Sequence, residues 1–317
     1  MRKKNLFIKI IAILILSFQQ VNAEDTTKYD YGNEYFYSEP DLFDFVTNTP
    51  SNFVNFFDFT FRKDNFPFIS TLVIITHIME RYDEELNRET HKFAMNNEIS
   101  KKYERGSANR EILDGYLKIP KNLNSWLLQL GNPLFHAGIG LSLAFYGNDK
   151  IYGPRPLQTS SQIFEALILD TLLIEVLSRT ITREKPFVSD ETSENWHFSF
   201  SKGYGEDYFK FTSFPASNIA YFTSTATILA TNYFEETYIG TISYMLGALL
   251  IFSSMNADLH WGSDFPIGIA IGYASAKSVM KKNLKKDEDI YKYKPYYEIN
   301  PMQFPDGGVG IVMNYKF

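Results

Sequence analysis

Cysteine is absent from all 317 residues of the chain, and histidine (5) and tryptophan (3) are scarce. Without cysteine the chain cannot form disulfides, use a thiolate nucleophile or build a thiolate zinc site. Cations are outnumbered, because 31 Lys and Arg stand against 37 Asp and Glu, for a formal net charge of −6. A net acidic chain lacks the basic surface on which nucleic-acid binding depends, so we expect no nucleic-acid partner.

The sequence also has no glycine-rich phosphate loop and no dinucleotide fingerprint, and its few histidines form no metal-binding pattern. We therefore predict no cofactor and no metal. What the chain has in quantity is apolar: 44% of its residues are hydrophobic, with 28 Phe and 21 Tyr. This composition is sufficient for a large buried core and argues against disorder. The aromatic excess suggests large aromatic surfaces and a lipid or membrane as a neighbour.

Residues 1–23 have the pattern of a secretory signal peptide. A basic start is followed by the short apolar stretch 10–18 and by Val21-Asn22-Ala23, a small-residue cleavage site. The apolar stretch is too short for a membrane anchor, which needs about 20 residues. Cleavage would remove four cations and no anion, changing the net charge from −6 to −10. We expect export, and an exported chain without disulfides fits the periplasm or cell envelope of a bacterium.

The predicted fold is an all-α helical bundle over residues 66–280. Residues 24–65 are acidic and aromatic without a sustained period, so we predict an irregular segment that covers the core. Residues 281–317 begin as a charged helix end, and Pro305-Asp306-Gly307-Gly308 then predicts a C-terminal β-hairpin. Within the bundle, apolar periodicity predicts helices near 68–79, 81–93, 132–147, 161–179, 217–232, 238–257 and 265–280.

One of these helices could cross a membrane, because residues 238–257 contain no charge over twenty positions. Glu165, Asp170 and Glu175 interrupt another helix, and the mean hydropathy of −0.21 is low for a polytopic membrane protein. A buried helix of a soluble bundle is also hydrophobic all round. We expect a soluble bundle and not a transmembrane one, with peripheral contact with a membrane surface left open. His77 and His136 lie in apolar helical stretches and are expected in the core.

The segment Asp-Leu-His-Trp-Gly-Ser-Asp-Phe-Pro, residues 258–266, carries the best candidates for chemistry. Asp264 stands where a helix begins and can be its N-cap. Alternatively, Asp264 accepts a hydrogen bond from one ring nitrogen of His260. That bond would fix the tautomer and leave the other nitrogen as nucleophile or base. The segment alone leaves both interpretations open.

Two further segments precede it in order: residues 178–186, where cations close a helix, and residues 213–218, Ser-Phe-Pro-Ala-Ser-Asn, which open the next. Together the three resemble the signature of the type 2 phosphatidic acid phosphatase and vanadium haloperoxidase superfamily. That signature is Lys, six residues and Arg-Pro; then Pro-Ser-Gly-His; then Ser-Arg, five residues, His, three residues and Asp. The resemblance covers roughly residues 66–280. It implies the family's helical bundle and the hydrolysis of phosphorylated lipids or small phosphoesters. In that reaction His260 would attack phosphorus, and Asp264 would orient His260.

The resemblance also identifies substituted anion-binding positions. The family's Arg-Pro is Lys185-Pro186, which keeps a charge but loses the bidentate guanidinium. The family's Lys falls on Ser178, with Arg179 next to it but about 100° round the helix. The family's other Arg falls on Ser254. Haloperoxidase activity would need the same anion contacts and is expected to be lost with them.

The middle motif is altered as well. Its serine falls on Ala216 and its glycine on Ser217, so a hydroxyl contact with phosphate would be displaced by one residue. Ser217 can equally be the N-cap of the helix that follows. The family's histidine, which protonates the leaving group, falls on Asn218. An amide cannot donate a proton in that way, and general acid catalysis is typically worth about 10²–10⁴-fold.

Two functions follow. The first is an exported phosphatase-like enzyme with an impaired site. Its predicted catalytic residues are His260 and Asp264, and its phosphate-binding residues are Lys185, Ser217 and Asn218. The second is a non-catalytic protein of the cell envelope that binds a lipid or a partner on the same fold.

Overall fold

The computed structural model describes most of the predicted bundle. The expected signal peptide lies outside the described residues, as does the turn between the two predicted C-terminal strands. The described residues are 26–30, 33–37, 39–99, 122–147, 154–188, 196–197, 212–233, 238–281, 284–285, 296–303 and 309–316.

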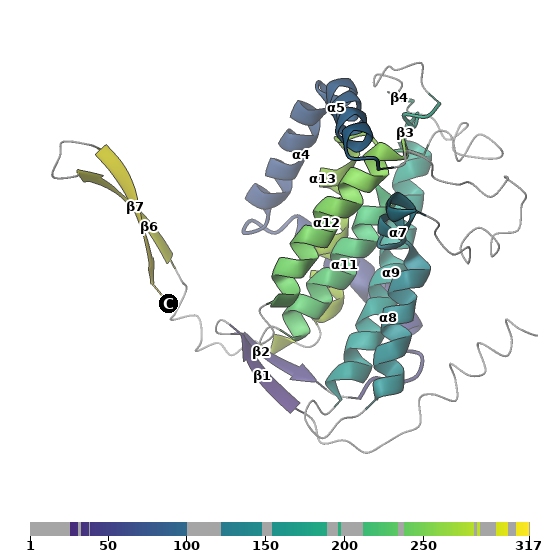
Figure 1. Cartoon of the computed structure of the whole chain (residues 1–317). Helices are drawn as coiled ribbons and strands as arrows, with labels where there is room; N and C mark the ends of the chain where they lie inside the picture. Colours follow the sequence, from purple (N-terminus) through teal and green to yellow (C-terminus); the bar gives the residue numbers. More distant parts are fainter. Residues whose placement is uncertain are drawn as a thin grey trace, which may run out of the picture.

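The described part of the chain is mostly helical, as predicted, and its longer helices run side by side (Figure 1). The helices are α2 (Asp44–Thr47), α3 (Thr49–Thr60), α4 (Phe66–Glu80), α5 (Asp83–Asn96), α7 (Leu123–Gln129), α8 (Pro133–Tyr146), α9 (Arg155–Thr180), α11 (Ser217–Asn232), α12 (Tyr238–Asn256) and α13 (Asp264–Met280).

Short antiparallel strands accompany the helices. In one sheet β1 (Thr26–Asp30) pairs with β2 (Asn33–Tyr37), which pairs with β5 (Leu284–Lys285). A second pair joins β3 (Thr182–Arg183) to β4 (Trp196–His197). The third joins β6 (Tyr296–Gln303) to β7 (Val309–Lys316), with Tyr296 opposite Lys316. These last two strands flank the predicted turn at residues 305–308 and pair antiparallel, as expected of a hairpin.

Helices α9, α11 and α13 pack against one another and form the centre of the bundle. Two glycines of α13 allow the close approach to α11. A Cβ at Gly268 would lie 2.5 Å from the carbonyl oxygen of Ala216, and one at Gly272 would lie 2.3 Å from that of Ala220. Any side chain at either position would push the two helices apart, because the obstacle is backbone.

The other long helices surround these three. Helix α8 packs on α9 and α11, α12 packs on α11, and α4 packs on α13. Helix α3 packs on α9 and α13 and buries Asn52 and Phe56. The sequence predicts irregular structure over 24–65, but residues 49–60 form a regular helix. Its period is hard to recognise because Phe53 and Phe57, outside the buried face, are as apolar as Phe56 on it.

The two histidines expected in the core differ. His136 of α8 is buried, with 1% of its surface exposed, as expected. His77 of α4 is not: 69% of its side chain is exposed, and its Nδ1 lies 3.5 Å from Glu80 on the same helix. Helix α4 has no buried residue, although it is one of the most apolar of the helices that the structure describes. Helix α12 is long and apolar enough to cross a membrane, while α4 and α8 are apolar but shorter.

Candidate functional site

The candidate residues lie at the end of the bundle where α12 gives way to α13. Three connections meet there: residues 257–263, the start of α11, and β3 with the residues that follow it (Figure 1). Main-chain hydrogen bonds join them. Ser213 N donates to the carbonyl of Arg183 over 3.1 Å, and Ala216 N donates to the carbonyl of Asp264 over 3.2 Å. The three predicted motifs therefore come together through their backbones.

His260 is buried, with 5% of its surface exposed, and its orientation is fixed by the main chain. Its Nδ1 lies 2.7 Å from the carbonyl oxygen of Ser213. A carbonyl can only accept, so Nδ1 carries the proton and Nε2 presents a lone pair. Within the described part of the chain, Nε2 has no hydrogen-bond partner. This is the tautomer that a nucleophilic imidazole needs.

Burial, together with the nearby Lys185 cation, lowers the pKa of His260 to about 4, although Asp264 and the Ser213 carbonyl oppose the shift. The imidazole is therefore neutral at pH 7. A neutral ring can attack an electrophile without first losing a proton.

Asp264 is close to His260 but does not make the predicted hydrogen bond to it. Its Oδ2 lies 3.9 Å from His260 Nδ1, and the Ser213 carbonyl has taken that partner's place. Asp264 Oδ2 instead accepts hydrogen bonds from Trp261 N, over 2.8 Å, and from the Ser213 hydroxyl. Asp264 is also not the N-cap, because it is the first residue of α13 and Ser263 precedes it as the cap. Asp264 thus joins the segment that contains His260 to Ser213, whose carbonyl orients the imidazole.

A fully buried ion-pair network lies behind the histidine. Arg183 Nη1 donates to Asp264 Oδ1 over 2.8 Å and to Ser263 Oγ over 2.7 Å. Arg183 Nη2 donates to Asp83 Oδ2 over 2.7 Å. Asp83 in turn accepts from Ser263 N over 2.9 Å and from its hydroxyl over 2.5 Å. One guanidinium thus bridges two carboxylates and locks the start of α13 to the start of α5.

The charges of this network stabilise one another. Burial raises the pKa of Asp83, against the opposing effects of Arg183 and Ser263. Burial alone would lower the pKa of Arg183, but Asp264 and Asp83 together raise it above its ordinary value. The guanidinium also lies over the rings of Trp196 and Trp261, at 4.6 and 5.5 Å from their centroids.

The contacts made by four residues near His260 were not predicted from the sequence: Asp83, Arg183, Ser213 and Ser263. Asp83 is 180 residues from Ser263 and 100 from Arg183 in the chain. Its local signal is that of an ordinary helix start, since Asp83 opens an acidic first turn of α5. The cation-rich segment 178–186 gave a partial signal for Arg183, because a cation that directly follows the end of an apolar helix needs a partner if it is buried.

Lys185 is near enough to His260 for its charge to lower the pKa of the imidazole. Its neighbours hold it there. The carbonyl of Glu184 accepts a hydrogen bond from Trp261 Nε1 over 2.8 Å, and Phe187 N donates to the carbonyl of Asp258 over 3.3 Å. Only 7% of the Lys185 surface is exposed. Lys185 is thus a largely buried cation whose charge acts on the imidazole.

Ser217 and Asn218 open α11, next to the residues that contact His260. The N-cap of α11 is Ala216, so the interpretation of Ser217 as the cap is wrong. The Ser217 hydroxyl makes no hydrogen bond to any residue that the structure describes. Asn218 Nδ2 donates to Ser254 Oγ over 2.6 Å, and Ser254 donates to the carbonyl of Leu250 over 2.7 Å. Two substituted positions of the motifs therefore contact each other directly.

At Ser178, the position of the family's Lys, no neighbouring cation takes over the lost charge. Ser178 is buried near the end of α9 with only a long contact, 3.5 Å, to the carbonyl of Glu175. The neighbouring Arg179 pairs with the Glu175 side chain, Nε to Oε1 being 2.7 Å. Arg179 is thus engaged along its own helix, and Lys185 is the cation that this part of the structure brings to His260.

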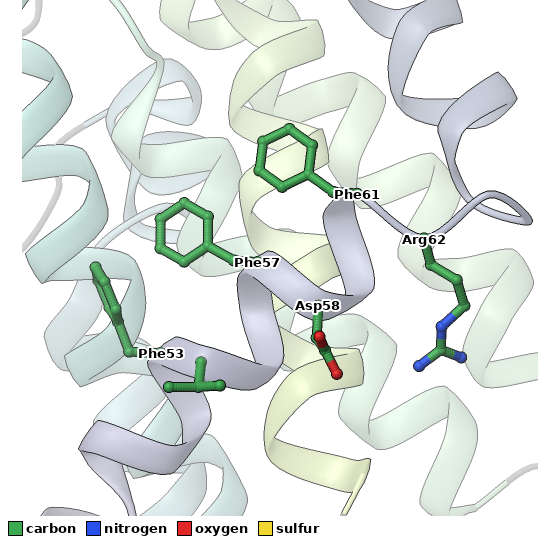
Figure 2. Close-up of a pocket in the computed structure, with 6 residues that line it drawn as sticks. Phe53, Phe57, Asp58, Phe61 and Arg62 are labelled. Carbon is green, nitrogen blue, oxygen red and sulfur yellow. The ribbon is translucent and has the colours of Figure 1, made fainter.

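Two other features bear on ligands. Figure 2 shows an open hollow on α3 lined by Phe53, Phe57, Phe61 and the charged Asp58 and Arg62, none of which belongs to the site around His260. Among the residues that the structure describes, no group of three His, Asp or Glu side chains is arranged to hold a metal ion.

Comparison with known proteins gives one match. No curated protein and no solved structure matches the chain significantly. Residues 161–287 match the PAP2 superfamily, the type 2 phosphatidic acid phosphatase family that the three motifs resemble. This range contains the buried Arg183, the start of α11 and the His260 connection, so the chain carries a PAP2 superfamily domain over residues 161–287.

Proposed function

We propose that this domain binds a phosphate group between Lys185 and His260 and hydrolyses phosphate compounds that have good leaving groups, by way of a phosphohistidine. The observation that supports this proposal is the state of the His260 side chain. Its Nδ1 proton is held by the Ser213 carbonyl, its low pKa keeps the ring neutral, and Nε2 is free of protein partners in the described residues. The phosphatase-like lineage of the domain supports the same chemistry.

In the proposed reaction, the Nε2 lone pair of His260 attacks phosphorus while the bond from phosphorus to the leaving-group oxygen breaks. The phosphorylated ring keeps its Nδ1 proton and carries a positive charge. The Ser213 carbonyl and the carboxylate of Asp264, at 3.9 Å, stabilise that charge. Water then attacks phosphorus, releasing inorganic phosphate and returning the electron pair to Nε2. Lys185 is the proposed counter-ion of the phosphoryl oxygens.

The leaving group decides which substrates react. An alkoxide from a phosphomonoester needs a proton as it departs, and Asn218 cannot supply one. A phosphate expelled from a diphosphate leaves as a stable anion and needs none. The loss of general acid catalysis, about 10²–10⁴-fold, therefore falls on monoesters and spares anhydrides. We propose a diphosphate, on a lipid or on a small molecule, as the preferred substrate, with an overall rate reduced by the missing cations.

A second candidate is a non-catalytic protein on the same fold that binds a lipid or a partner. One observation favours it: Asn218 and Ser254 satisfy each other with a hydrogen bond of 2.6 Å. Polar groups paired in this way are stable without a ligand.

We further propose that the protein is exported to the periplasm or cell envelope. Its N-terminal sequence after purification from that compartment would begin at Glu24.

The test is phosphate release by the purified chain from a lipid monophosphate, a lipid diphosphate and a soluble diphosphate. We expect release from the diphosphates, slower release from the monophosphate, and none from the His260→Ala variant. The matched control is His77→Ala, which removes an exposed histidine outside the site and should keep the full rate. Equal background release from wild type and His260→Ala would reject the enzyme and leave the binding protein.

A further inference from the structure

We infer that Asp170, Ser224 and Ser275 bind a monovalent metal cation of the size of Na⁺ in the core of the bundle. The inference goes beyond the proposed chemistry and does not depend on it. It revises the expectation, drawn from the sequence, that no metal is bound. It rests on three buried side chains, one from each of the central helices α9, α11 and α13 (Figure 1).

Helix packing brings the three side chains together. A Cβ at Gly272 would lie 3.0 Å from Ser224 N, so α13 touches α11 beside Ser224. Ser275 follows Gly272 by about one helical turn and therefore lies on the same side of α13. The hydroxyls of Ser275 and Ser224 both act on the carboxyl group of Asp170, which comes from α9. The three helices thus contribute one side chain each to a single polar cluster.

The oxygens of this cluster lack donors. Asp170, Ser224 and Ser275 are all 0% exposed. Both carboxylate oxygens of Asp170 and the hydroxyl oxygen of Ser275 have no hydrogen-bond partner among the described residues. The Ser224 hydroxyl gives its proton to the carbonyl of Tyr221 over 3.1 Å, so it presents only lone pairs to Asp170. Buried acceptor oxygens that face one another need a positive centre between them.

No charged side chain supplies that positive centre. Burial raises the pKa of Asp170 to about 7, and the two serine hydroxyls oppose the shift. The charges of α9 itself take no part in this shift. The same holds for the charged side chains and the histidine on the elements that pack on α9, which are Asp44, Asp58, His136, Arg183, Asp264 and Lys277. A proton neutralises the carboxylate below pH 7, and a cation does so above it, because an uncompensated charge in a protein core is costly.

The donor set selects a small monovalent ion. Carboxylate and hydroxyl oxygens suit hard cations. The single carboxylate of Asp170 balances one positive charge, whereas a divalent ion would leave a net charge in the core. Ca²⁺ takes about six to eight oxygen ligands and Mg²⁺ keeps several waters, which three fully buried side chains do not provide. The cluster is enclosed by packed helices, and this enclosure favours an ion as small as Na⁺.

The cation joins the three helices that carry the candidate site. Counted along the helices from Thr180, Ser217 and Asp264, the cluster lies about 10–16 Å from the site end. It is therefore too deep to contact a phosphate group bound at His260. The cation acts on the stability of the bundle and not on the chemical step.

Thermal unfolding of the purified full chain tests the inference, with NaCl compared against N-methyl-D-glucamine chloride at equal ionic strength. At about pH 8.5, NaCl should raise Tm by about 3 °C or more, because a ligand that binds only the folded state stabilises it. At about pH 5.5 a proton competes for Asp170, so the apparent affinity for Na⁺ should fall about 30-fold and the difference in Tm should nearly vanish. Equilibrium dialysis with ²²Na⁺ at the higher pH should show one bound ion per chain.

Two matched pairs of variants locate the effect. Asp170→Asn should abolish the rise in Tm and the ²²Na⁺ binding, whereas Glu165→Gln, at a buried carboxylate that Asn52 binds over 2.6 Å, should keep both. Ser275→Ala should weaken Na⁺ binding about tenfold or more. Ser278→Ala should not, because the Ser278 hydroxyl already donates to a carbonyl of its own helix over 2.6 Å. A wild type with equal Tm in both salts at about pH 8.5, or an Asp170→Asn protein that keeps the rise, would overturn the inference.

Discussion

Replacing Arg183 by methionine should destabilise the protein strongly, because it removes the cation between two buried carboxylates. Arg183, Asp83 and Asp264 are all fully buried, and the guanidinium makes ion pairs of 2.7 and 2.8 Å with the two aspartates. Breaking a buried ion pair from one side typically costs 3–5 kcal/mol, since the partner charge is left uncompensated. The hydrogen bond to Ser263 is lost as well, so we expect about 3–5 kcal/mol or somewhat more for Arg183→Met.

The matched control is Arg179→Met, four residues earlier, where the ion pair with Glu175 is partly exposed and spans one helical turn. Exposed pairs of this kind contribute about 0.3–0.5 kcal/mol. In thermal unfolding, followed by circular dichroism in the medium that keeps the wild type monodisperse, Arg183→Met should lower Tm by roughly 6–20 °C. Arg179→Met should lower it by no more than about 2 °C.

Two further measurements separate charge from packing. Adding Asp83→Asn to Arg183→Met removes one of the uncompensated charges and should recover part of the lost stability. The penalty should also shrink at low pH, because burial raises the pKa of Asp83 and a protonated carboxyl no longer needs the guanidinium. An Arg183→Met protein that melts within about 2 °C of wild type, or no deeper than Arg179→Met, would refute the role assigned to this network.

Three other predictions follow from the site and the helix packing. The kcat/KM for a diphosphate should stay constant down to about pH 4 and decrease at lower pH, since the neutral form of His260 attacks phosphorus and the pKa of His260 is about 4. A decrease that already begins near pH 6.5 would contradict this. Gly272→Ala should cost about 1–3 kcal/mol in chemical denaturation, whereas Gly138→Ala, with open space around it, should be neutral or slightly stabilising; equal effects would refute the close packing. Asn218→His together with Ser254→Arg should raise monophosphate hydrolysis by about 10²-fold or more while changing diphosphate hydrolysis less, measured as phosphate release; an unchanged preference would contradict the missing general acid.

The sequence predicted much of the helical framework, because the signals that it uses are local. Helix α11 begins and ends at the predicted residues, and α12 and α13 agree to within one residue at each end. Long apolar runs bounded by Gly, Pro or Asn give such helices clearly. Helix α7 and helix α3 were not predicted, because one is only seven residues long and the other is aromatic on more than one face.

The sequence named candidate residues for the site but not the contacts that hold them. The motifs identified His260, Asp264 and Lys185, and the structure brings them to one end of the bundle. The sequence did not reveal that a main-chain carbonyl orients the histidine, because a backbone acceptor has no residue signature. Nor did it reveal Asp83, which comes from outside the matched family segment and meets Arg183 only through the tertiary fold.

The direction of the charged side chains on α9 was not predictable from the sequence, for a related reason. Where a helical side chain points depends on neighbours that are distant in the sequence. Glu165 faces α3, and its two amide partners lie more than 110 residues earlier. Periodicity alone could not separate an inward charge from an outward one on a helix whose neighbours were unknown.

The central claim is that His260 forms a covalent bond to phosphorus. The direct measurement is to mix the purified chain with a diphosphate labelled with ³²P at its terminal phosphate and to quench within a turnover under alkaline conditions, where phosphohistidine survives. Label should be retained on the wild type and on His77→Ala, be absent from His260→Ala, and be released by acid. Turnover of the diphosphate with no protein-bound label, or label that persists in His260→Ala, would contradict the account.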